Sequence, residues 1–282
     1  MSSWICPNCG SAATTRYCGN CGERRLDDPQ GAPDKPITGL QPSFLDRLRA
    51  SLVGLVSPPG QITSDWIRGR RMRYLTPLSL FLWINVAFFL IQSISGLGIL
   101  TWPLRAHLSD DLFSGFTTWL FARRGHDPAA ITSGYAELFN ALEAVHAKSL
   151  VIVMVPPFAV TLAVLTLDRH EPFRHSWTFA LHFFAFSLLW FSALFPVGAI
   201  VLRALTVSGF ATVDHHVMDL AFTAVEAGGL AWYIYAAAGT VFGMKPLRRF
   251  ITVVALIAVL YVILKAYHVV VFAVTLYSTP AS

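Results

Sequence analysis

The amino-acid sequence predicts an all-α polytopic membrane protein, in which about five transmembrane helices follow a small N-terminal domain with four cysteines. Hydrophobic residues make up 55% of the chain and charged residues only 13%, which is typical of a membrane protein rather than of a soluble domain. Five apolar stretches are long enough to cross a bilayer, which requires about 20 residues. All the cysteines lie between positions 6 and 21, and they predict the N-terminal domain.

The cysteines form two Cys-x-x-Cys pairs in the sequence CPNCGSAATTRYCGNCG. Each pair can direct two sulfurs to one point, and the following glycine, Gly10 or Gly22, allows a tight turn beneath a metal ion. The spacing therefore predicts a zinc ribbon over residues 1–26, with one structural zinc ion per chain. A fragment this small needs the metal for its folding energy. The predicted ligands are Cys6, Cys9, Cys18 and Cys21.

Two other uses of the cysteines compete with zinc binding, namely disulfides of a secreted domain and redox-active dithiols. Cys-x-x-Cys disulfides are usually redox devices rather than structural links. Residues 1–5 also lack the positively charged and apolar start of a cleavable signal peptide, so we do not expect secretion. Structural zinc is the favoured interpretation.

The apolar stretches predict a transmembrane domain over residues 75–282. Its second helix is the shortest and contains Pro156 and Pro157, which kink a spanning helix and leave carbonyl groups for neighbouring helices to satisfy. We therefore expect this helix inside the bundle, and a re-entrant or interfacial segment is the alternative. The five predicted spans cover approximately residues 75–100, 150–167, 178–202, 217–243 and 250–277.

Lysine and arginine residues predict the orientation in the membrane. The segments 1–74, 168–177 and 244–249 together carry fifteen, against five in 101–148 and 203–216. By the positive-inside rule the N-terminus faces the cytoplasm and the C-terminus lies outside. The expected location is the inner membrane, as a multi-pass protein. The cysteines then lie in a reducing compartment, which favours metal binding over disulfides.

Residues 27–42 combine proline, glycine and charge, and they predict a flexible linker. An amphipathic and basic juxtamembrane segment follows over 43–74. Ser43 is the expected N-cap of a helix that lies in the membrane interface or packs against the bundle. The apolar side of this helix comprises Phe44, Leu48, Leu52 and Leu55.

Four arginines crowd next to the first span in the sequence WIRGRRMRYL, between the expected interfacial anchors Trp66 and Tyr74. Their plainest role is to fix the orientation as a stop-transfer cluster. The alternative is contact with anionic lipid headgroups or with a phosphate-bearing ligand, because guanidinium groups bind phosphate bidentately. These arginines are Arg68, Arg70, Arg71 and Arg73.

Over about residues 1–90 the chain resembles the DUF3667 family of uncharacterised bacterial membrane proteins. The resemblance rests on the ribbon CPNCG…YCGNCG and on the stretch PG-x6-IRGRR-x-RYL-x-P, which leads into the first span. It implies the N-terminal zinc ribbon and the membrane topology. It implies no activity and no catalytic residue.

The outer loop 101–148 is long for a connector, and it predicts two amphipathic helices that cap the bundle or lie on the outer membrane surface. The apolar side of the first comprises Leu112, Phe113, Phe116, Trp119 and Leu120. That of the second comprises Tyr135, Leu138, Phe139, Leu142 and Val145, with Glu137 and Glu143 away from it.

Two ionisable residues of opposite sign fall within the last two predicted spans. Glu226 and Lys265 would lie at similar depths, and a charged side chain at that depth costs about 2.5–3.5 kcal/mol on insertion scales, so we expect an ion pair between them. His268 lies one helical turn beyond Lys265 and could join the pair. In the alternative, Lys265 reaches the outer headgroups while Glu226 is protonated or faces water.

The chain contains no Gly-rich phosphate loop, no nucleophile elbow and no His-Glu-x-x-His sequence, so we predict no catalytic residues. Several histidines would lie near the outer side, but their spacing matches no recognised set of metal ligands. They are His107, His126, His146, His215, His216 and His268.

The favoured function is that of a non-enzymatic scaffold, sensor or partner-docking protein. One alternative is a transporter or channel that uses Glu226 and Lys265, and a second is an intramembrane enzyme acting on lipid. The expected partners are the lipid membrane with its anionic headgroups and a cytosolic protein that binds the ribbon. No nucleic acid is expected.

Overall fold

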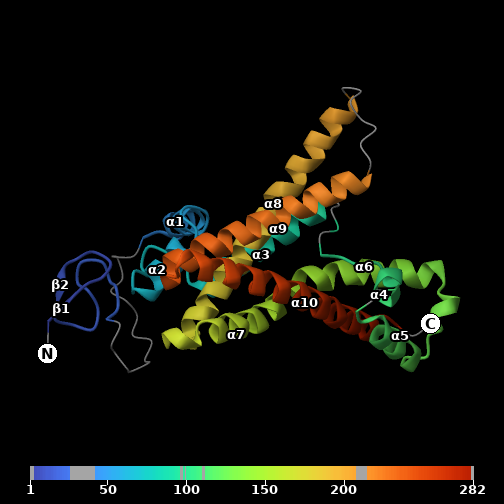
Figure 1. Cartoon of the computed structure of the whole chain (residues 1–282), viewed down its shortest axis with the longest axis horizontal. Coiled ribbons are helices and arrows are strands. Elements are labelled where there is room, and N and C mark those ends of the chain that lie inside the picture. The colour runs from blue at the N-terminus through green and yellow to red at the C-terminus, as the bar shows by residue number, and fades with distance from the viewer. Residues whose placement is uncertain are drawn as a thin grey trace. The chain divides into compact units, whose positions relative to one another are not determined.

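The computed structural model describes residues 3–25, 42–95, 98, 100–109, 112–207 and 215–280. Most of these residues are helical (Figure 1), which confirms the predicted fold class in its main feature. The chain divides into two compact units. The first comprises residues 1–84 and 171–253, and the second comprises residues 85–170 and 254–282. All of the predicted linker 27–42 except its last residue lies outside the described residues.

The first unit begins with a two-stranded antiparallel ribbon, formed by β1 (Trp4–Ile5) and β2 (Ala12–Ala13). Trp4 pairs with Ala13, and Ile5 pairs with Ala12. The strands are short because the chain must turn around the first cysteine pair between them.

Helix α1 (Phe44–Val56) begins as predicted, since the Ser43 hydroxyl accepts a hydrogen bond from the backbone N–H of Asp46 at 3.2 Å. The predicted apolar side of this helix is buried only in part, since Leu55 is buried but Phe44 is 47% exposed. The buried residues are Ser51, Gly54 and Leu55. This side of the helix packs on an irregular stretch of chain before α3, whose backbone groups need hydrogen-bond partners that apolar side chains cannot supply.

Helix α2 (Gln61–Ile67) packs against α8 (Phe173–Val207) and α9 (His215–Phe242), which lie side by side in this unit (Figure 1). Gly60 precedes α2 with a φ of +82°. A Cβ atom at Gly60 would lie 2.8 Å from the Cα of Ala237 on α9, closer than carbon atoms approach. Both the backbone conformation and the close approach therefore require glycine at this position.

Three helices are long and apolar enough to cross a membrane among the residues described, which is compatible with a membrane protein. A fourth candidate is a pair of helices bent by 55°, α6 (Ser133–Ser149) and the stretch Val151–Leu165. The described chain thus has three or four candidate spans, against the five predicted. The three single helices are α3 (Pro77–Ser95), α8 and α10 (Pro246–Ser278).

The predicted fourth span, 217–243, coincides with α9, but its described part is not among these candidates. Glu226, paired glycines and several residues with polar atoms lower its mean hydropathy.

The bent pair changes the interpretation of the predicted second span, 150–167. A short 3₁₀ turn (Val151–Met154) leads into α7 (Val155–Leu165), and Pro156 and Pro157 stand in the first turn of α7. A first-turn N–H needs no partner within the helix, so the prolines begin a helix here rather than kink one. Helix α6, which the sequence assigned to the outer loop, becomes half of this candidate span.

The second unit also contains α4 (Leu104–Ser109) and α5 (Ser114–Arg123). The apolar sides predicted for the loop helices are exposed in part, at Phe116, Trp119, Leu138 and Val145. Leu120 and Phe139, from the same predicted sides, are buried in a core around α10. This core comprises Leu104, Leu120, Phe121, Phe139, Phe272 and Leu276.

We expect Gly60→Ala to lower the free energy of unfolding by about 2–4 kcal/mol, because alanine adds both left-handed backbone strain and a clash with Ala237. Thermal unfolding of the purified chain in detergent measures this effect. Gly134→Ala is the matched control, since a Cβ there meets nothing within 4 Å. Equal melting temperatures for the two variants would contradict the close packing of α2 on α9.

Candidate metal centre

The two cysteine pairs fold into the same local structure. In each, the glycine after the second cysteine donates its N–H to the carbonyl of the first, Gly10 to Cys6 at 2.9 Å and Gly22 to Cys18 at 2.8 Å. Both glycines have a φ of +75°, a conformation that favours glycine. The first cysteine of each pair also donates its N–H to the residue five positions on, at 2.9 Å and 2.8 Å. The repeated sequence CxNCG therefore produces two equivalent turns.

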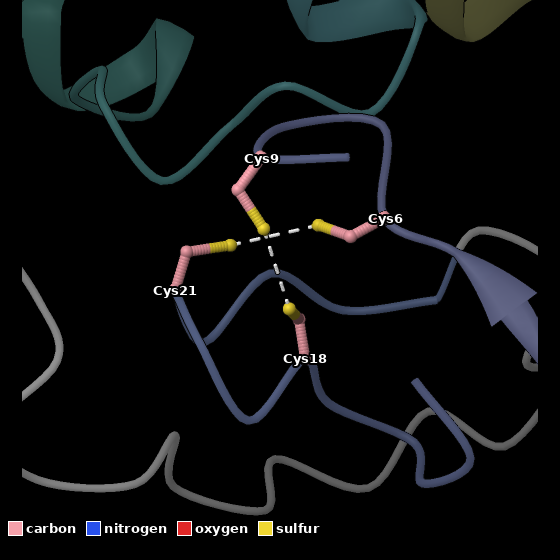
Figure 2. Close-up of side chains that lie close together, drawn as sticks. All are labelled: Cys6, Cys9, Cys18 and Cys21. Carbon is pink, nitrogen blue, oxygen red and sulfur yellow. Dashed lines mark hydrogen bonds between the residues drawn. The ribbon is translucent and has the colours of Figure 1, made fainter. Parts of the chain in front are cut away.

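These turns bring the four sulfurs together, as Figure 2 shows. The Sγ atoms of Cys6 and Cys21 lie 3.5 Å apart, as do those of Cys9 and Cys18, and all four lie within 4.8 Å of one another. A disulfide needs a sulfur–sulfur distance of about 2.05 Å, so the cysteines are not paired as disulfides. Four thiolates around one ion at about 2.3 Å would be about 3.8 Å apart. The geometry fits a single tetrahedral metal ion.

The thiols differ in how readily they lose their protons. Burial raises the pKa of the Cys6 thiol to about 12 and raises that of Cys21, whereas hydrogen bonds with Ser11 lower the pKa of Cys9 to about 6. Four thiolates at these distances would repel one another strongly. A bound divalent cation is what allows all four to be deprotonated, and its binding would release protons.

Within the described residues, no other group of three or more histidine, cysteine or acidic side chains could hold a metal ion. The predicted outer histidines that the structure describes therefore do not form a metal site. The side chains of His215 and His216 lie outside the described residues.

Glu23 joins the cysteine turns to the chain before α3. We call residues 68–76, between α2 and α3, the arginine loop. The Glu23 side chain is almost completely buried, at 2% exposed, and one carboxylate oxygen accepts the backbone N–H groups of Arg71 at 2.8 Å and Met72 at 2.9 Å. Burial raises the pKa of Glu23, and these two hydrogen bonds oppose that effect. Because Glu23 directly follows the second turn, the cysteine centre fixes its position.

Two further contacts attach the ribbon to the arginine loop. The guanidinium Nε of Arg70 donates to the carbonyl oxygen of Pro7, within the first cysteine turn, at 3.2 Å. A Cβ at Gly22 would lie 3.3 Å from the terminal methyl group of Met72. Both cysteine turns therefore contact the arginine loop.

Asp65 on α2 holds the arginine loop from within the helical part of the unit. Its carboxylate accepts hydrogen bonds from the Tyr74 hydroxyl at 2.8 Å and from the Gln61 amide at 2.8 Å. Its carbonyl accepts the backbone N–H of Arg70, also at 2.8 Å. Burial, together with the hydrogen bond to Asp65, raises the pKa of Tyr74 to about 12. Asp65 therefore holds the loop at Arg70 through its carbonyl and at Tyr74 through its carboxylate.

Helix α1 contributes the remaining polar contacts to the arginine loop. Arg47 donates two hydrogen bonds to the Tyr74 carbonyl, at 3.0 Å and 2.7 Å. The Ser51 hydroxyl accepts the backbone N–H of Leu75 at 2.9 Å. These contacts explain why α1 buries the polar side chain of Ser51.

The structure separates the four predicted arginines into two groups. Arg71 donates to the Trp66 carbonyl at 3.1 Å, stacks over the Trp66 ring, and has its pKa lowered by burial. Arg70 lies 3.4 Å from the Asp65 carboxylate. These two arginines help to hold the loop together. Arg68 and Arg73 are exposed, and the role of all four in lipid or phosphate binding stays a prediction.

The second unit contains a buried group of ionisable and aromatic side chains. Glu143, which the sequence places away from the apolar side of its helix, is nevertheless buried, at 1% exposed, and accepts the backbone N–H of Trp102 at 3.0 Å. Its carboxylate also lies 3.7 Å from His107 Nε2. The Trp102 ring stacks on His268 at 4.4 Å, and Lys265 Nζ lies 4.3 Å from the same ring centre.

Lys265 and His268 are thus brought together at Trp102, as their spacing on one helix suggested. Glu226 lies half-buried on α9 in the first unit. Its ion pair with Lys265 stays a prediction.

Sequence reasoning missed Glu23, Asp65 and Arg47 as organising residues. Glu23 and Arg47 act on backbone groups far along the chain. One available signal was a lone acidic residue, Asp65, close before the arginine cluster.

Comparison with known proteins bears on the α1–α3 region alone. No curated protein and no solved structure matches the chain. One family model does match. Its segment contains most of α1, all of α2, the arginine loop and the first part of α3. The match confirms the resemblance drawn from the sequence for that segment. Residues 46–89 match the family described as "Protein of unknown function (DUF3667)".

Proposed function

We propose that the four cysteines bind one structural zinc ion and that the ribbon so formed is a cytosolic module of a non-enzymatic inner-membrane protein. Four thiolates complete a tetrahedral shell, which leaves no open position for water or substrate. A closed shell of this kind supports a structural role for the metal. The chain would work as a scaffold, sensor or partner-docking protein.

The contact of Glu23 with the arginine loop is the observation that carries this proposal. Without this contact, the ribbon and the helical part of the unit could move independently of each other. Here its buried carboxylate accepts two backbone N–H groups a few residues before α3, a candidate span. Metal loss or partner binding that alters the ribbon would therefore change the conformation of the chain at the start of that span.

The cytoplasmic position of the ribbon rests on the distribution of lysine and arginine, of which the arginine loop is the densest part. A reducing compartment keeps the four thiols available to the metal.

Purified protein prepared without chelator should contain about one zinc ion per chain, and Cys6→Ser/Cys9→Ser should contain almost none, because removal of one complete turn leaves two ligands. Elemental analysis measures the ratio. Arg68→Gln, which leaves the ribbon unaltered, should retain the full zinc content. A wild-type preparation with no zinc, or with another metal in its place, would contradict the proposal.

A single cysteine introduced at Asp127 should react with a membrane-impermeant thiol reagent added outside sealed cells, whereas cysteines at Arg174 and Lys245 should react only after the membrane is opened. The charge bias places the last two inside. Labelling at Arg174 in sealed cells would reverse the orientation.

Affinity purification of the intact chain should recover a cytosolic protein that Cys6→Ser/Cys9→Ser fails to recover, because the ribbon loses its fold with the metal. Arg68→Gln serves again as the control with an intact ribbon. Recovery of the same proteins with all three forms would contradict partner docking through the ribbon.

A further inference from the structure

We propose that a pocket between α1 and the arginine loop binds a phosphate-bearing anion, and that the headgroup of an anionic phospholipid supplies it. This site is separate from the cysteine centre and goes beyond the proposed function. The pocket has a volume of about 380 Å³, and its charged lining comprises Asp46, Arg49, Asp65, Arg70 and Arg73. Three of these side chains are arginines, only two of which belong to the cluster singled out from the sequence.

The two acidic side chains of the pocket already have partners within the protein. Asp46 accepts a hydrogen bond from the Ser43 hydroxyl at 2.7 Å, in the first turn of α1. Asp65 accepts hydrogen bonds from Gln61 and Tyr74, and it lies beside Arg70. Arg70 offsets the charge of Asp65, and with Arg49, Arg73 and Asp46 counted the pocket retains an excess of one positive charge.

Arg49 and Arg73 are the cations that remain for a ligand. Both are exposed, and in the part of the chain that the structure describes neither forms an ion pair. The Arg73 guanidinium stacks over the Tyr74 ring at 5.0 Å. Stacking uses the flat face of the group and leaves its N–H edge available to a ligand. Two guanidinium groups at one pocket are suited to the oxygens of a phosphate.

The surroundings of the pocket indicate a lipid rather than a free anion. It lies against the arginine loop, directly before the candidate span α3. On α1, Arg49 continues a line of exposed apolar side chains at helical spacing, formed by Leu45, Val53 and Val56. Leu45 is 72% exposed and Val53, which also lines the pocket, is 60% exposed. A phospholipid would place its phosphate at the arginines and its acyl chains along this apolar line.

The test uses the purified, zinc-loaded full chain in a neutral detergent, titrated with phosphatidylglycerol and examined by native mass spectrometry. Arg49→Gln/Arg73→Gln should bind phosphatidylglycerol about tenfold more weakly than the wild type, through the loss of charge-assisted hydrogen bonds. Arg49→Gln alone, an exposed change on a helix surface, should give part of this loss. Arg68→Gln, outside the pocket but in the same loop, should bind like the wild type.

Phosphatidylcholine carries the same phosphate beside a choline cation, so it should bind more weakly than phosphatidylglycerol and lose less affinity in the double variant. Inorganic phosphate should compete poorly; if it displaces the lipid at similar concentration, a free anion is the ligand and the lipid assignment is wrong. Unchanged binding by the double variant, or an equal loss in Arg68→Gln, would overturn the site. Zinc content and lipid-free melting temperature, measured on the same samples, show whether the variants fold and whether the ribbon is intact.

Discussion

One buried carboxylate, that of Glu23, accepts two backbone N–H groups from the arginine loop, and the arrangement of the first unit depends on this interaction. The loop is irregular, so its backbone cannot satisfy its own hydrogen bonds as a helix does. A buried N–H without a partner costs about 1–3 kcal/mol. Removal of the Glu23 carboxylate would leave two N–H groups without this acceptor. The cysteine turn that directly precedes Glu23 sets the position of the carboxylate.

The contacts around the loop form a continuous series of polar interactions from the cysteine turns to the candidate span α3. Zinc would fix the two cysteine turns, the second turn fixes Glu23, and Glu23 fixes the backbone at Arg71 and Met72. Asp65 and Arg47 hold the next residues, and the loop then leads into α3. Such hydrogen bonds are directional, and water can replace either partner when they break. The ribbon is therefore attached through correctly placed hydrogen bonds more than through buried apolar surface. That property suits a module whose attachment depends on its metal.

The sequence predicted those features that depend on local spacing. The four cysteines meet as their spacing required, Ser43 caps its helix, and the chain is helical with apolar stretches long enough to span a membrane. Features that depend on distant partners could not be predicted. Arg71 lies 48 residues beyond Glu23, and nothing local marks the pair. The boundaries of the second candidate span were also hidden, because α6 contains Glu143 and Lys148, and charged residues lower the hydropathy of a helix even where they are buried.

Backbone hydrogen exchange at Arg71 and Met72, in the zinc-bound full chain, tests most directly whether the ribbon holds the arginine loop. With Glu23→Ala both amides should exchange at least about tenfold faster than in the wild type, since each loses its acceptor. Glu137→Ala, which removes an exposed carboxylate from α6, should leave both rates unchanged. Chelation of the metal from the wild type should reproduce the Glu23→Ala result. Rates at Arg71 and Met72 that respond neither to Glu23→Ala nor to chelation would contradict the account.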